Sequence, residues 1–172
     1  MQLPKMATVK QHFAATSLDD VAGEVRSQLA AAGLADAIAP GARIAVSSGS
    51  RGIANIPLIT RTVVDCVKAA GGEPFLLPAM GSHGGATAEG QIAVLASYGI
   101  TEESMGCPVE STIDVVEVDQ LADGTPVLLN RLATEADGVL LINRIKPHTS
   151  FRGVFESGLM KMMTIGLGSH KG

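Results

Sequence analysis

The sequence predicts an α/β fold: a mostly parallel, doubly wound (Rossmann-like) sheet with helices on both faces and a β-hairpin excursion. Two observations predict it. Short apolar runs alternate with longer segments whose apolar residues recur at helical spacing, which is typical of parallel strands joined by crossover helices. A further pair of apolar runs flanks Asp123-Gly124, a dipeptide typical of hairpin turns.

The first elements follow from local signals near the N-terminus. Residues 8–13 are predicted to form a short edge strand. Ser17 is expected to cap a helix, because acidic residues follow in its first turn, where the helix dipole favours them. Apolar residues continue at helical spacing to Leu29, and Gly33 marks the end of this helix.

Alternating strands and helices make up the middle of the chain. Residues 42–46 form an apolar strand, and apolar residues at helical spacing from Ile56 to Val67 predict a helix that ends at a glycine pair. Residues 75–77 predict the next strand, and Thr87 is expected to cap the helix that follows.

The last predicted strands lie in the C-terminal half. Residues 113–118 and 126–129 predict the two strands of the hairpin, and the apolar run 138–142 predicts a buried strand. The final residues, 166–172, are typical of a loop that enters a further element. Residues 1–172 are therefore expected to be a single N-terminal α/β domain of a longer, two-domain protein.

Composition limits the function classes. The 172 residues suit one domain, and 46% apolar with 17% charged residues indicates a globular chain. A net charge of −4 argues against a general nucleic-acid binder, which needs a basic face. No run approaches the ~18–20 apolar residues of a membrane span, and no signal peptide is recognisable. Two cysteines in such a chain predict reduced thiols and a cytoplasmic protein without membrane partners.

Three predicted strands end in polar, glycine-containing loops, 47–52, 81–87 and 143–153. The carboxyl ends of parallel strands lie along one edge of a sheet, where ligands bind. We therefore expect Arg51, His83 and His148 to face one cleft. Any of the three alone is weak evidence, and their convergence is the strongest physical indication of a site.

The first loop favours an anion. It matches neither a Walker A motif nor a dinucleotide fingerprint. Its small residues expose backbone N–H groups ahead of a helix, and the guanidinium of Arg51 can bind a carboxylate or phosphate through two hydrogen bonds. The alternative is a surface arginine in an ordinary turn.

The two loop histidines are candidate acid–base groups. Glycines flank the sequence around His83 and leave its imidazole accessible, while Pro147 stiffens the loop before His148. Arg144 and Lys146 add positive charge nearby. The alternative for His83 is a histidine that caps a turn.

Two further residues, Lys161 and His170, each have two interpretations. Lys161 lies in an apolar, methionine-rich stretch, so it either extends its amine to water or is desolvated and nucleophilic. His170 is either a metal ligand or a solvent-facing histidine near the chain end.

At these residues the chain resembles the nickel-dependent lactate racemase superfamily, over roughly residues 40–172, which correspond to its N-terminal domain. The matching motifs are Ser50-Arg51, Gly81-Ser82-His83-Gly84, Lys146-Pro147-His148, the segment from Gly158 to Lys161, and His170. The resemblance implies an isomerase: a racemase or epimerase of a 2-hydroxy acid or sugar acid.

The resemblance also implies roles for single residues. His83 and His148 would be the acid–base pair, and Ser50, Arg51, Arg144 and Lys146 would bind a small anionic carboxylate substrate. Gly81, Ser82 and Gly84 would contact a nickel-pincer nucleotide, with Lys161 as its covalent tether and His170 as the protein ligand to nickel. The C-terminal domain of the same protein would be the partner.

The chain departs from the lactate enzymes in its lysine segment, which has fewer glycines, and Lys171 is a rival tether. The extra cations Arg144 and Arg152 suit a larger or more acidic substrate, such as a sugar acid. Two alternatives remain: a nickel-independent sugar-acid isomerase or dehydratase, and a non-catalytic anion-binding domain.

Overall fold

The computed structural model describes residues 6–13, 16–50, 52–148, 150 and 152–171. Its strands are β1 (Arg43–Ser48), β2 (Glu73–Pro78), β3 (Val115–Gln120), β4 (Pro126–Asn130) and β5 (Gly138–Leu141). Its longer helices are α1 (Val21–Ala31), α3 (Ile56–Ala69) and α4 (Ala88–Ser97). Short helical turns are α2 (Leu34–Ala37), α5 (Glu102–Met105), α6 (Arg131–Thr134), α7 (Leu159–Lys161), the 3₁₀ turn η1 (Gly84–Ala86) and the π-helical turn η2 (Met162–Gly166).

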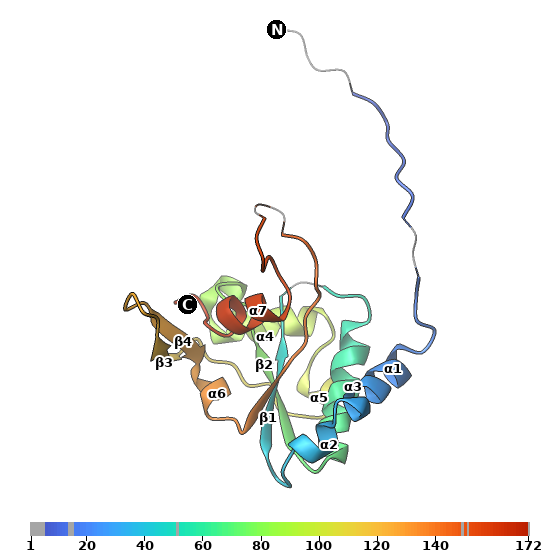
Figure 1. The fold of residues 1–172 in the computed structure, drawn as a ribbon. Coiled ribbons are helices and arrows are strands. Elements are labelled where there is room, and N and C mark those ends of the chain that lie inside the picture. The colour runs from blue at the N-terminus through green and yellow to red at the C-terminus, as the bar shows by residue number, and fades with distance from the viewer. Residues whose placement is uncertain (1–5, 14–15, 51, 149, 151, 172) are drawn as a thin grey trace.

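The centre of the molecule is a parallel sheet in the order β2-β1-β5 (Figure 1). Val46 in the middle strand lies opposite Leu76 of β2 and Leu140 of β5. Strands β1 and β2 are almost continuously buried, as parallel strands covered on both faces are. The expectation of a buried strand at 138–142 is wrong in this respect: β5 lies at the edge of the sheet, its side chains are only partly buried, and Val139 is 36% exposed. The predicted α/β fold with a parallel sheet is confirmed.

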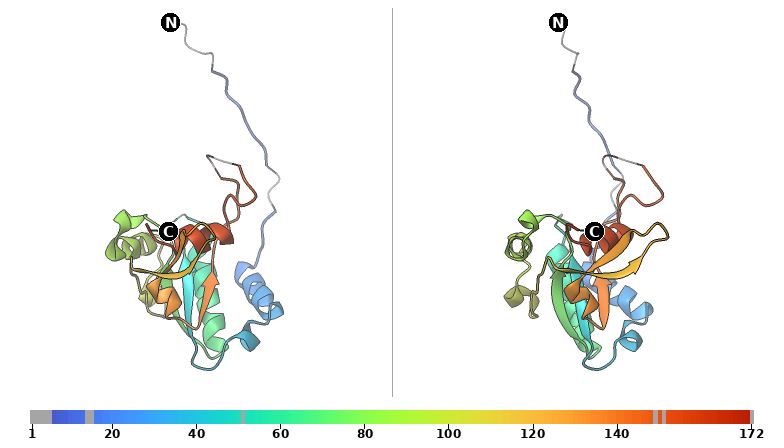
Figure 2. Two further views of the ribbon diagram at one scale, coloured as in Figure 1. Left: turned by 60° about the vertical axis from the view of Figure 1, so that its left-hand side comes forward. Right: turned by 90° about the vertical axis from the view of Figure 1, so that its left-hand side faces the viewer.

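Helices cover both faces of this sheet, because alternate side chains of each strand point to opposite sides. Ile44 and Val46 pack with α3, α4 and α5 on one face. Ala45, Phe75 and Leu77 pack on the other, with α6 and the terminal turn η2. Figure 2 shows α1 to α3 on one side of the sheet and α6 on the opposite side, with α7 above the ends of the strands.

The predicted hairpin is also confirmed, as β3 and β4 pair antiparallel across the turn at Asp123-Gly124. It projects from the body of the molecule (Figure 2), and its apolar side chains are only half buried. The hairpin therefore adds little to the closed core.

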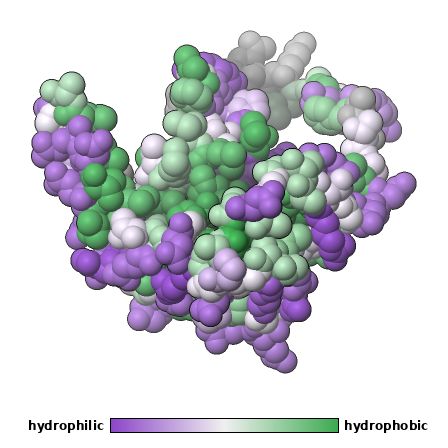
Figure 3. All heavy atoms as spheres, turned by 60° about the horizontal axis from the view of Figure 1, so that its bottom comes forward, coloured by the Kyte–Doolittle hydropathy of each residue, from purple (hydrophilic) through white to green (hydrophobic). Residues whose placement is uncertain are grey.

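Figure 3 shows the face at the amino ends of the strands, where apolar side chains gather in a central hollow with polar side chains around it.

Two expectations for the N-terminus are wrong. Residues 8–13 pair with no strand and extend away from the body (Figure 1). Helix α1 is capped by Asp20 and not by Ser17: the Asp20 carboxylate accepts a hydrogen bond of 2.7 Å from the Gly23 N–H. Both residue types are good caps, but only Asp20 stands three residues before a free helical N–H group.

The expected cap of α4 is confirmed, since the Thr87 hydroxyl accepts the Gly90 N–H at 3.0 Å. Both cysteines are free, Cys66 within α3 and Cys107 in the core. Within the described ranges, every helix is too short or too polar to cross a membrane.

Candidate functional site

A cavity of about 650 Å³ lies at the carboxyl ends of β1, β2 and β5. The loops after the three strands and the terminal helical turns all contribute to it, as predicted for this edge of a parallel sheet. The cavity is lined by Gly49, Ser50, Gly52, Ile53, Ala79, Met80, Gly81, Ser82, His83, Ile142, Asn143, Arg144, Lys146, His148, Ser157, Lys161, Met162, Ile165 and Gly166. No aspartate or glutamate is among these described lining residues, so the cavity suits an anion.

The loop that carries His83 is held by a buried side chain. Gly81 has a φ of +60°, which turns the chain sharply after β2 and suits glycine. The amide of Gln91 on α4, 2% exposed, donates to the Gly81 carbonyl at 3.0 Å and to the His83 carbonyl at 3.5 Å. Its own carbonyl accepts the Ser111 hydroxyl at 3.4 Å. Helix α4 thereby fixes the backbone on both sides of Ser82.

The His83 ring is in turn hydrogen-bonded to the first loop. Ser50 Oγ and His83 Nδ1 form a hydrogen bond across the cavity mouth. The Ser50 carbonyl accepts the Tyr98 hydroxyl at 2.8 Å. Tyr98 follows α4 directly, so this helix holds both the His83 loop and the residue that contacts its ring.

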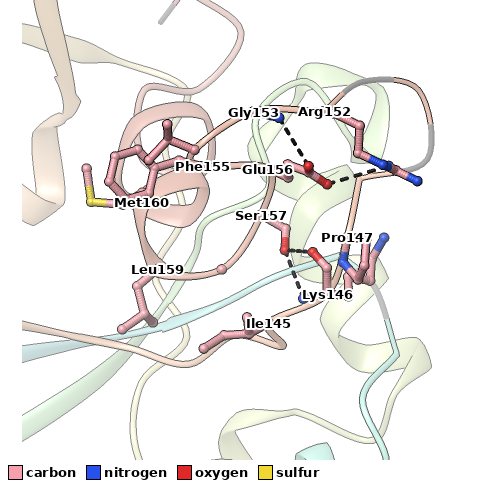
Figure 4. A pocket seen from close by; sticks show the side chains of 12 residues that line it. Ile145, Lys146, Pro147, Arg152, Gly153, Phe155, Glu156, Ser157, Leu159 and Met160 are labelled. Atoms are coloured by element: carbon pink, nitrogen blue, oxygen red, sulfur yellow. Dashed lines mark hydrogen bonds and ion pairs between the residues drawn. The ribbon is translucent and has the colours of Figure 1, made fainter.

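The loop that carries His148 is organised around Glu156 (Figure 4). One oxygen of this carboxylate accepts the His148 backbone N–H at 2.8 Å, and the other accepts the Gly153 N–H at 3.1 Å. Arg152 completes the set: its guanidinium lies 3.6 Å from Glu156 and donates to the His148 carbonyl at 2.7 Å. A single carboxylate thus closes the loop on itself.

Further polar contacts fix the ring of His148 and its neighbour Lys146. The Ser150 backbone N–H donates to His148 Nδ1 at 3.1 Å. The Ser157 hydroxyl accepts the Lys146 N–H at 2.9 Å and donates to the Lys146 carbonyl, as Figure 4 shows. A second hollow of about 610 Å³ lies within this loop, lined only by residues between 145 and 160.

The terminal turns α7 and η2 close one wall of the main cavity. Asn143, after β5, donates its amide to the Gly158 carbonyl at 2.6 Å and so fixes the start of α7. Met162 packs so close to the first loop that a Cβ at Gly49 would stand 3.1 Å from its methyl group. Lys161 lines the cavity with an exposed side chain, and not as a lysine buried among methionines.

Not all predicted residues meet in this cavity. Arg51 lies outside the described residues. Gly84 begins η1 and packs on α4, where a Cβ on Gly84 would lie 2.7 Å from the backbone nitrogen of Gln91. His170 is exposed and is not part of the cavity lining. The other predicted residues do meet: Ser50, Gly81, Ser82, His83, Arg144, Lys146, His148 and Lys161.

The residues that hold the site were missed by sequence reasoning. Gln91 lies on the same face of α4 as Leu95 and Tyr98, and this i, i+4, i+7 pattern signals a buried amide. Glu156 carries no such signal, because an acidic residue in a loop is ordinarily solvent-exposed.

Within the described part of the chain, no three His, Cys, Asp or Glu side chains gather as a metal cluster. Two side chains outside the cavity have shifted pKa values. Burial raises the pKa of the Cys107 thiol, and hydrogen bonds from Thr125 lower the pKa of the Asp123 carboxyl. The local charge of the cavity comes from Arg144, Lys146 and Lys161.

Residues 6–172 match the family model described as the lactate racemase N-terminal domain. No curated protein and no solved structure matches the chain. The family match covers every helix and strand described above, including all three loops around the cavity.

Proposed function

Because this match spans nearly the whole sequence, the chain belongs to the lactate racemase N-terminal domain family, and we propose that it serves a racemase or epimerase of a 2-hydroxy acid or sugar acid. The observation that carries the proposal is that two histidines and three cations line one cavity whose described lining has no carboxylate. Two acid–base groups are what a reversible inversion at one carbon requires, one for each face.

The cations supply substrate affinity. Arg144 and Lys146 follow β5 at the cavity wall and carry the charge that a carboxylate needs. Arg51, outside the described residues, is proposed as a third carboxylate ligand. Together Arg51, Arg144 and Lys146 exceed the need of a single carboxylate, which favours a larger or more acidic substrate such as a sugar acid.

The proposed cofactor is a nickel-pincer nucleotide. When bound, it supplies the hydride acceptor that protein side chains lack. The cavity fits such a group in two respects: its volume is within the range of sites for small organic cofactors, and Lys161 presents an exposed amine to it as the tether. His170, which is exposed and stands outside the cavity lining, is the proposed protein ligand to nickel, a metal that takes imidazole readily. Gly81 and Ser82 line the wall that the cofactor would meet, and Gly84 lies behind it.

The histidines handle the hydroxyl proton. One imidazole accepts the proton from the substrate hydroxyl as the substrate becomes a planar 2-keto acid. The other imidazole gives a proton back after reduction on the opposite face, and the configuration is inverted. Because His83 and His148 come from the ends of different strands, β2 and β5, they approach the cavity from different sides.

A second domain of the same protein is the proposed partner. The loop around His148 and the turn α7 expose apolar side chains, with Val154 92%, Phe155 66% and Leu159 49% accessible. Closure by a further domain would exclude water from the cavity, which strengthens the electrostatic contacts inside it.

The test uses the full-length protein expressed with its cofactor-maturation partners. Intact mass and metal analysis should show a covalent adduct that Lys161→Ala abolishes, with stoichiometric nickel. Inversion of a panel of 2-hydroxy and sugar acids is followed by chiral chromatography. His83→Ala and His148→Ala should each lower kcat by about 10²- to 10⁴-fold, the usual contribution of a general acid or base.

The matched control is His12→Ala, since His12 lies in the extended N-terminal segment. Retained turnover in either cavity variant would refute the acid–base assignment. Turnover without nickel or adduct would favour the nickel-independent sugar-acid isomerase or dehydratase. Anion binding that survives both histidine changes, with no turnover on any substrate, would favour a non-catalytic binding domain.

A further inference from the structure

We propose that Ser50 is a positioning residue for His83, setting which ring nitrogen carries the proton so that Nε2 acts as the base. The inference rests on the proposed function and refines the role of one member of its histidine pair. It starts from the hydrogen bond between Ser50 Oγ and His83 Nδ1. Ser50 was expected to bind substrate, but its hydroxyl is already engaged by the ring.

A hydroxyl can both donate and accept a hydrogen bond. A neutral imidazole that takes a proton at Nε2 must hold its own proton at Nδ1, and that N–H group needs an acceptor. Ser50 Oγ lies in hydrogen-bond contact with His83 Nδ1 and is placed to accept from an Nδ1–H group. When His83 removes the substrate hydroxyl proton, the O–H bond breaks, an Nε2–H bond forms, and the Nδ1–H group keeps its partner throughout.

His148 provides the contrast within the same cavity. Its Nδ1 faces the Ser150 backbone N–H at 3.1 Å, and a backbone N–H can only donate. The neutral ring of His148 therefore carries its proton on Nε2 in this arrangement. To act as a base at Nε2, His148 must first give up the contact with Ser150, whereas His83 needs no such change.

The contact between Ser50 and His83 is held on both sides by one helix. Gln91 fixes the backbone of the His83 loop, and the Tyr98 hydroxyl fixes the Ser50 carbonyl at 2.8 Å. The two residues are seven positions apart, Gln91 in α4 and Tyr98 at its C-terminal cap, so they lie on one side of the helix about two turns from each other. A chance surface contact would have no reason to be supported twice from the same element.

The test is histidine-selective ¹⁵N NMR of the protein, at a pH where the rings are neutral. Ser50→Ala should lower the ratio of the Nδ1–H to the Nε2–H form of His83 by about fivefold, as expected for loss of one ordinary hydrogen bond. Ser50→Thr, which keeps the hydroxyl, should restore the ratio, and Tyr98→Phe should shift it less. The control Ser97→Ala removes a hydroxyl that donates to the Val94 carbonyl within α4 at 2.7 Å.

The signals of His148 should stay constant in all these variants and report that the fold is intact. An unchanged His83 ratio in Ser50→Ala would overturn the proposal. In the loaded enzyme, Ser50→Ala should lower kcat and leave KM nearly constant, while a raised KM at constant kcat would assign Ser50 to substrate binding and also overturn it. The NMR result does not depend on turnover, so failure of the racemase assignment would be recognised separately.

Discussion

Two loops bring a histidine to the cavity, and the protein holds them in different ways. The His83 loop is tied to the core through Gln91, which is 2% exposed, and its backbone lies against α4. The His148 loop is tied mainly to itself, through the carboxylate of Glu156, whose side chain is 16% exposed. In Figure 1 it rises from the carboxyl end of β5 and returns to the body only at α7.

The difference indicates a fixed side and an adjustable side of the cavity. Groups held by buried hydrogen bonds move only when the core opens, while loops with few buried apolar contacts open locally at much lower cost. Every described residue from 144 to 147 and from 152 to 155 is exposed. Substrate entry and closure are therefore expected to involve the His148 side, with His83 as the stationary reference.

The largest effect that tests this comparison is on global stability at the fixed side. Gln91→Met keeps the length of the side chain and removes its hydrogen bonds, which leaves the buried Gly81 carbonyl unsatisfied. We expect a loss of about 1–3 kcal/mol in the free energy of unfolding, the cost of an orphaned buried polar group. Chemical denaturation measures it.

Gln28→Met is the matched control. Gln28 lies on exposed α1 and bonds Glu24 at 2.8 Å, four positions earlier. Such a pair contributes about 0.2–0.5 kcal/mol, so the control should change little. Equal losses in the two variants would contradict the claim that Gln91 ties the His83 loop to the core.

The sequence predicted the sheet and its converging loops because both follow from local patterns. Apolar runs fix the strands, and the carboxyl-end rule then brings residues as distant as Ser50 and His148 to one cavity. The strand expected at residues 8–13 was wrong because alternation predicts an extended chain but not a partner for it. The i, i+4, i+7 pattern around Gln91 indicates a buried position but not its partners, and the Glu156 contacts leave no period in the sequence, so both sets of contacts were missed.

A medium effect is expected at the adjustable side. Glu156→Ala removes the acceptor of the His148 and Gly153 amides. Their hydrogen exchange should accelerate by roughly tenfold, because a hydrogen bond to a charged group contributes about 1.5 kcal/mol or more. Global stability should fall by less than about 1 kcal/mol, since the loop opens without the core.

Glu156→Gln is the informative companion, because its amide keeps one acceptor oxygen and loses the charge. Exchange rates between those of the parent and of Glu156→Ala would show that both the charge and the geometry contribute. A fall in global stability as large as that of Gln91→Met would mean that the two loops are coupled to the core alike, and the comparison would fail.

The smallest effect is expected from Ser157→Ala. Among the described residues, the Ser157 hydroxyl hydrogen-bonds only to the backbone of Lys146, accepting its N–H at 2.9 Å and donating to its carbonyl. Exchange of the Lys146 amide should rise about three- to fivefold, in line with one ordinary hydrogen bond, with stability changed by less than about 0.5 kcal/mol. If exchange at His148 stays constant, the Lys146 turn and the Glu156 network open independently, so a cation can adjust to substrate without displacing the histidine. If His148 accelerates equally, the loop opens as one unit, and carboxylate binding at Lys146 and proton transfer at His148 must then be coupled.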